Sequence, residues 1–209
     1  KVRNFNIDDK EQTETPLSGF SNDANIDYKL LESEILEEFI RMMFIKGTNS
    51  KDIIVFLKEC EKIKSSIEIN DKEGLAFVYH SLGKCHLSLD DKDKADYYFN
   101  ETIDLGKKVG SNYYESQGLI GRGKIMLISE DNDGALNQFR SVSKLNIWDH
   151  KDIQYQMYIG ILNIANLNND SDLKNEYLSD AENLIQEDKN RGYLYEELQA
   201  LMNANGSVD

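Results

Sequence analysis

The chain repeats one pattern of small and aromatic residues at an interval of 40 residues. The matching pairs are Gly83 and Gly123, Ala95 and Ala135, and Phe99 and Phe139. Self-similarity at a fixed interval is typical of proteins built from repeated supersecondary units. A single unit of this kind cannot bury its apolar face alone, so the units are expected to stack and to stabilise one another. We expect the small residues to let helices approach closely and the phenylalanines to fill the space between adjacent units.

The repeated units are predicted to be helical hairpins. Apolar residues recur at three- and four-residue steps from residue 28 onward, which is typical of amphipathic helices. The only proline, Pro16, precedes all of these segments, so no proline interrupts them. The expected helices are 71–88 and 92–109, then 112–129 and 133–145, then 150–167 and 171–187, and a last helix over 191–203. Gly110 is expected to end its helix, and the Asp- and Asn-rich turns are expected to cap the helices that follow them.

These segments divide the chain into three parts. Residues 1–27 are polar, without sustained periodicity, and are predicted to be a flexible N-terminal arm or linker. The repeats are predicted to occupy residues 28–190, at about 28–68, 71–110, 112–147 and 150–188. Residues 191–209 are predicted to form a C-terminal capping or connecting helix and its tail.

One segment holds aromatic residues, a Leu-Gly pair and then Ala and Phe at regular spacing, in Tyr79, Leu82, Gly83, His86, Ala95, Phe99 and Thr102. It resembles the tetratricopeptide repeat (TPR) family. The next unit keeps Leu119, Gly123, Ala135 and Phe139, the first keeps Ile53, Leu57 and Cys60, and the fourth keeps Gly160, Tyr177 and Ala181. The resemblance implies an all-α fold, a right-handed superhelical α-solenoid of stacked antiparallel hairpins. The interval of 40 residues exceeds the family's usual ~34, so we expect helices longer by about one turn.

In this family the first helix of each hairpin lines the concave face, where an extended peptide or a helix binds. The resemblance assigns the ligand-facing positions to Phe77, His80, Lys84, Gln117, Ile120, Lys124, Gln154 and Met157. Lys84 and Lys124 occupy the same repeat position, and two lysines facing one groove would hold a carboxylate. The alternative is that both are ordinary solvated surface lysines.

The net charge of −14 limits the partners of the chain. An acidic surface argues against binding to a nucleic-acid backbone or to an anionic membrane, because both need a basic face. No stretch approaches the roughly 18 apolar residues of a membrane span. The remaining class of partner is a protein or peptide ligand, and formation of a homo-oligomer is neither predicted nor excluded by the sequence. Cys60 and Cys85 lie among apolar residues at helical spacing and are expected to be buried and reduced, which favours a cytoplasmic location.

The sequence shows no catalytic, metal-binding or cofactor motif. A calcium-binding EF-hand loop that began at Ser129 would need a bidentate glutamate at its twelfth position, where the chain has Arg140, a cation. His80 and His86 lie six residues apart, which is the wrong spacing for a metal site on one helix face. The chain is therefore predicted not to be an enzyme and to use no cofactor.

The favoured function is a TPR scaffold that binds a protein or peptide on its concave face. The alternative is a regulatory sensor segment of a longer signalling protein, such as a transcription regulator, kinase or nucleotide cyclase. In that case the repeats bind a peptide or partner and the C-terminal helix relays the change.

Overall fold

The computed structural model describes residues 53–55, 57–58, 60–61, 64, 72–187 and 192–203. Within this part the secondary structure is helical, with no strand. The helices are α3 (Lys72–Ser88), α4 (Lys92–Val109), α5 (Asn112–Ile128), α6 (Asn132–Ser143), α7 (Lys151–Asn168), α8 (Ser171–Glu187) and α9 (Tyr193–Asn203). The helices predicted from residue 71 onward are confirmed, with ends that agree to within two residues. The predicted arm at 1–27 and most of the predicted first unit lie outside the described residues.

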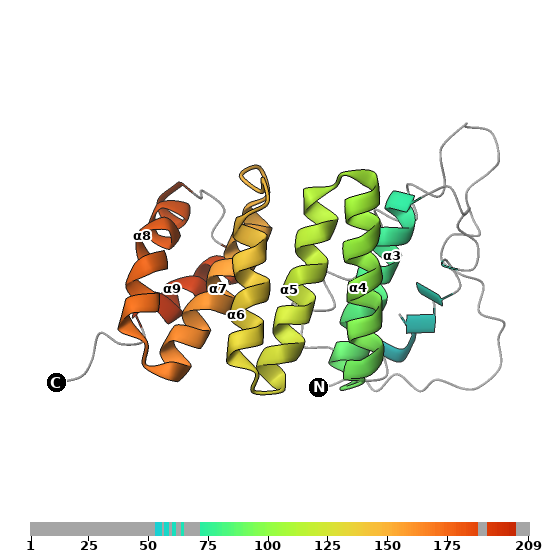
Figure 1. Cartoon of the computed structure of the whole chain (residues 1–209), viewed down its shortest axis with the longest axis horizontal. Coiled ribbons are helices and arrows are strands. Elements are labelled where there is room, and N and C mark those ends of the chain that lie inside the picture. Colours follow the sequence, from blue (N-terminus) through green and yellow to red (C-terminus); the bar gives the residue numbers. More distant parts are fainter. Residues whose placement is uncertain are drawn as a thin grey trace, which may run out of the picture.

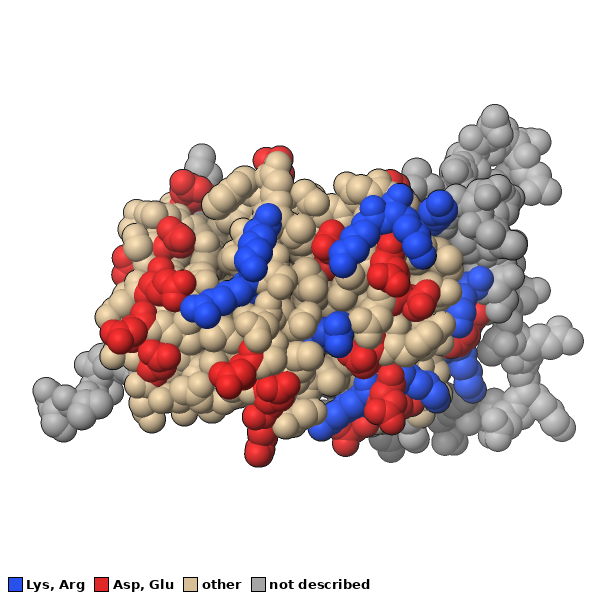
Figure 2. Space-filling view, in the orientation of Figure 1, with Lys and Arg blue, Asp and Glu red and all other residues tan. Residues whose placement is uncertain are grey.

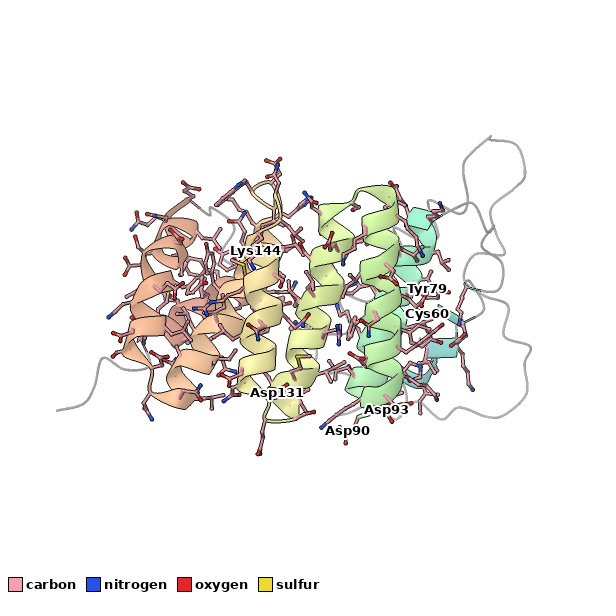
Figure 3. The ribbon with its side chains drawn as sticks, viewed as in Figure 1. Cys60, Tyr79, Asp90, Asp93, Asp131 and Lys144 are labelled. Carbon is pink, nitrogen blue, oxygen red and sulfur yellow. The ribbon has the colours of Figure 1, made fainter. Side chains whose placement is uncertain are left out.

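The turns inside the three hairpins, α3–α4, α5–α6 and α7–α8, share one backbone conformation. Each turn has one residue with positive φ: 61° at Asp90, 60° at Glu130 and 51° at Asn169. The next residue is an aspartate whose carboxylate accepts a hydrogen bond from a backbone N–H three residues later, in Asp91, Asp131 and Asp170. The predicted capping role of these turns is therefore confirmed. Figure 3 shows Asp90 and Asp131 at the same edge of the molecule.

The ring of Phe99 on α4 lies between glycines of the two neighbouring helices. A Cβ atom added at Gly83 of α3 would lie 2.7 Å from the ring, and one added at Gly121 of α5 would lie 2.5 Å from it. Ordinary contact begins near 3.4 Å, so a methyl group at either position would collide with the ring. The expectation that Phe99 fills the space between adjacent units is confirmed, because its ring contacts both α3 and α5.

Phe139 on α6 repeats this arrangement one hairpin later and corrects the register of the fourth unit. Its ring lies between Gly123 of α5 and Gly160 of α7. Gly160 contacts the phenylalanine of the preceding hairpin, as Gly121 does, so it corresponds to Gly121 and not to Gly123. The interval between α5 and α7 is therefore 39 residues, which is also the interval between their first residues.

The physical reason for the change of interval is the connection between α6 and α7. Helix α6 has 12 residues, against 18 in α4, so the expectation of longer helices does not hold for it. An irregular segment at 144–150 replaces the missing turns. Ile147 of this segment is buried, and its carbonyl oxygen accepts a hydrogen bond from Gln154 Nε2 at 3.1 Å. The connection is longer than that from α4 to α5, but the shorter α6 more than offsets it: the first residues of α6 and α7 are 19 positions apart, against 20 for α4 and α5.

Each helix from α3 to α9 packs against the next one along the chain. The first helices of successive hairpins also contact each other, α3 with α5 and α5 with α7, and the last helix, α9, contacts α7. Figure 1 shows α3 to α8 placed in chain order along the long axis of the molecule. The predicted all-α class and the packing of adjacent hairpins are therefore observed.

Ion pairs join neighbouring helices as well. Arg122 of α5 donates from Nε to Asp96 of α4 at 2.8 Å, and Arg140 of α6 donates from Nη2 to Glu176 of α8 at 2.9 Å. Figure 2 shows one face of the molecule, on which basic and acidic residues are interspersed and acidic residues gather over α8. Because both signs of charge are spread over this face, it does not form a uniformly basic surface.

Candidate functional site

All eight predicted site residues lie on α3, α5 and α7, the first helices of the three hairpins. We call the surface that these helices form the first-helix face. Only some of the eight keep surface to offer a ligand. Those with buried side chains are Phe77, Gln117, Ile120, Gln154 and Met157.

The five buried residues correct the prediction that all eight face a ligand. The physical reason is that first helices of successive hairpins touch, so the sides of these helices form helix–helix contacts. Gln117 and Gln154 satisfy their amide groups inside the protein. Gln117 Nε2 donates to the Tyr113 hydroxyl at 3.1 Å, and Gln154 Nε2 donates to the carbonyl oxygens of Ile147 and Trp148 at 3.1 and 2.9 Å.

The three basic residues of the set keep access to solvent. His80 and Lys84 on α3 are half-buried, and Lys124 on α5 is exposed. Burial lowers the pKa of His80 well below its ordinary value of 6.5, and the charges of Lys84 and Lys124 lower it further. At neutral pH the cluster therefore carries its positive charge on the two lysines, with a neutral imidazole beside them.

Lys124 lies in a recess of the surface. Its side chain reaches solvent, yet the surrounding protein removes part of its hydration and thereby lowers the pKa of its ammonium group. Glu197 of α9 acts in the opposite direction. The ammonium group donates a hydrogen bond to Gln156 Oε1 of α7 at 2.8 Å. The charge is thus held in place by a neutral acceptor rather than by a direct ion pair.

The recess is a pocket of about 210 Å³ between α5, α7 and α9. Its walls combine apolar and polar side chains, from Lys124, Leu127, Phe139, Gln156, Ile159, Gly160, Asn163, Tyr193, Leu194 and Glu197. Such a mixture of an apolar lining with a few polar groups is typical of small binding pockets. The volume is enough for about one large side chain of a ligand.

The corrected register explains which residues of α7 line the pocket. With the interval of 39, the counterparts of Gln117, Ile120 and Lys124 are Gln156, Ile159 and Asn163. All three line the pocket, whereas the predicted Gln154 and Met157 do not. Sequence reasoning missed these residues because it matched Gly160 to Gly123, which places Gln154 and Met157 opposite Gln117 and Ile120. The spacing of Gly160 from Phe139, close to that of Gly121 from Phe99, was the signal that would have found them.

A row of three polar residues therefore runs across the first-helix face. Lys84, Lys124 and Asn163 occupy one repeat position on α3, α5 and α7. Two ammonium groups and an amide can bind carboxylate oxygens or the carbonyl groups of a peptide backbone. The contribution of α9 to the pocket was also missed, because contacts between segments distant in sequence leave no local signal.

Two further properties concern the described residues alone. They contain no group of three or more His, Cys, Asp or Glu side chains arranged to hold a metal ion. None of their helices has the length and apolar character needed to cross a membrane. Comparisons of the chain with protein-family models, with curated proteins and with solved structures each found no match.

Proposed function

We propose that the chain is a helical-repeat scaffold of the TPR type that binds a protein or peptide segment along its first-helix face. The observation that carries the proposal is the row formed by Lys84, Lys124 and Asn163, one residue from each of three adjacent first helices. In a chain with a net charge of −14, a row with two lysines and no acidic member favours an acidic segment or a free carboxylate as ligand.

The repeat geometry supports a right-handed solenoid as the frame of this site. Three hairpins use the same turn, and two of their interfaces use the same glycine–phenylalanine–glycine contact. Identical joints repeat nearly the same rotation between neighbours, and such repetition builds a superhelix with one continuous concave surface. Cys60 and Cys85 are buried and are not joined in a disulfide, which fits a reducing compartment such as the cytoplasm.

The alternative function is a regulatory segment of a longer signalling protein, in which α9 relays ligand binding. One observation favours it. Tyr193 and Glu197 of α9 line the same pocket as Lys124, so a ligand in the pocket would contact the helix that carries the relay.

The proposal can be tested without knowing the natural ligand. Peptides are selected on the full chain from a random library of displayed 12-residue peptides, and the affinity of the strongest binder is measured by fluorescence polarisation. We expect the selected peptides to be rich in Asp and Glu. The double variant Lys84→Glu/Lys124→Glu is expected to weaken binding at least ~10-fold, because a charge-assisted hydrogen bond contributes about 1.5–3 kcal/mol.

The matched control is Lys108→Glu/Lys144→Glu, which makes the same change of net charge at exposed positions outside the first-helix face. It should leave the affinity within about threefold of the unmodified chain, since exposed charges at a distance are screened by salt. Equal loss in both double variants, or loss in neither, would refute the proposed site.

A further inference from the structure

Helix α9 does not continue the packing pattern of the earlier first helices. Helix α5 packs more extensively against α4, the preceding second helix, than against α3. For α9 the order is reversed, and it packs more extensively against α7 than against α8. Figure 1 shows α9 behind α7 and α8 and running across them. The helix therefore lies over the first-helix face instead of extending the row of hairpins.

The two ends of α9 are held differently. Near its C-terminal end, the carbonyl oxygen of Leu201 accepts hydrogen bonds from Asn166 Nδ2 at 3.1 Å and from Lys174 Nζ at 3.4 Å. Leu198, in the middle of the helix, is fully buried. At the N-terminal end Tyr193 is 55% exposed, although it forms part of the pocket wall. Tyr195 in the same turn is buried, so this end is held by apolar packing, whereas the C-terminal end is also held by hydrogen bonds.

The N-terminal turns present to the pocket the chemistry that the proposed ligand would present. Glu197 places a carboxylate on the wall of the pocket that Lys124 also lines, and Tyr193 and Leu194 add apolar surface to the same wall. Sequence separation between α5 and α9 is large, so these contacts depend on the way that α9 is folded back.

We infer that the first turns of α9 are an internal mimic of the ligand: as one wall of the Lys124 pocket they cover this part of the first-helix face, and an acidic ligand that extends along the face binds there only by displacing them. The inference rests on the proposed function and adds its regulation. A tethered segment acts at an effective concentration in the millimolar range, so it competes with a free ligand even when its own affinity is low. If the covered state holds about 90% of the molecules, the apparent affinity for the ligand falls ~10-fold.

The test uses the full chain and a defined probe, a fluorescein-labelled synthetic peptide with the sequence of residues 192–203 and blocked ends. Two variants loosen α9 by different means. Glu197→Gln removes the carboxylate from the pocket, and Leu198→Ala removes buried apolar contact without changing any charge. The matched control is Glu196→Gln, because Glu196 is exposed, precedes Glu197 on the same helix and does not line the pocket.

We expect the peptide to bind both loosened variants at least about fivefold more tightly than it binds the unmodified chain or the control variant. A peptide with Gln in place of its Glu197 should bind at least about fivefold more weakly to the Leu198→Ala variant. Hydrogen exchange measured by mass spectrometry should show faster exchange at residues 193–197 in both loosened variants. Amides of α7 should keep their protection, which shows that the variants remain folded.

Two outcomes overturn the inference. One is unchanged peptide affinity in Leu198→Ala although exchange shows that α9 is released, because competition then has no effect. The other is unchanged exchange in Glu197→Gln, because Glu197 then does not hold the helix in place. If library-selected peptides still bind through Lys84 and Lys124 in these cases, the proposed function stands and only the mimicry fails.

Discussion

Gly121→Ala tests whether the packed phenylalanine is the joint between hairpins. The new Cβ would lie 2.5 Å from the Phe99 ring, which would have to move by about 1 Å to restore ordinary contact. The ring cannot move freely, because on its other side even a Cβ at Gly83 would lie 2.7 Å away. The strain must therefore be taken up by separating α3, α4 and α5, at the expense of their other contacts.

Two opposing effects set the size of the change. Overpacking of a filled core costs about 1–3 kcal/mol. Replacing glycine by alanine inside a helix contributes up to about 1 kcal/mol of stability in the opposite direction. The expected net result is a loss of about 1 kcal/mol. In the background Phe99→Leu the smaller side chain leaves room for the methyl group, so the same change should stabilise the chain by roughly 0.5–1 kcal/mol.

The assay is urea denaturation of the four proteins of this double-mutant cycle, followed by far-ultraviolet circular dichroism. Circular dichroism is preferred to tryptophan fluorescence, because the one tryptophan, Trp148, is 74% exposed and would report unfolding poorly. The expected coupling energy between positions 121 and 99 is about 1–2 kcal/mol. A coupling below ~0.5 kcal/mol, or an equal stabilisation by alanine in both backgrounds, would refute the proposed joint.

Two other changes test the core and the basic cluster. Ser116→Ala should stabilise the chain by about 1 kcal/mol in the same denaturation assay, because the Ser116 hydroxyl is buried without a hydrogen-bond partner. Ala76 occupies the equivalent position of the preceding unit, so alanine fits there. A loss of stability would show that the hydroxyl has a partner. His80→Gln should reduce the loss of stability on acidification. The folded state holds His80 neutral below its ordinary pKa of 6.5, so protons favour the unfolded state and stability falls as the pH drops from 6.5, by at most about 1.4 kcal/mol per pH unit for one proton. Parallel pH profiles of the two proteins between pH 5 and pH 6.5 would contradict this role.

Local features of the sequence predicted the helices and their joints well. Helix ends depend on caps and turn residues that lie within a few positions of each other, and Asp91 and Gly110 act as their residue types predict. The contact between Gly83 and Phe99 could also be predicted from the sequence, because the same pair recurs 40 residues later. The position of α9 over the first-helix face could not be predicted from the sequence. Its position depends on which surface a terminal helix buries, and apolar positions such as Leu198 would suit contact with either α7 or α8.

The positions predicted on α7, Gln154 and Met157, lie two residues before Gln156 and Ile159, which line the pocket, and two residues rotate a side chain by about 200° around a helix. Met157, like Gln154, is buried. Gln156, one residue earlier, faces the pocket and accepts the hydrogen bond from Lys124. The same rotation brings Asn163 into line with Lys84 and Lys124.

The short helix α6 and its irregular connection decide which side chains of α7 reach the first-helix face. A change in the length of the segment at 144–150 would therefore alter binding without changing any residue of the pocket. Inserting one glycine after Asn146 and measuring the affinity of a library-selected peptide tests this link. An unchanged affinity would show that α7 keeps its register independently of the connection.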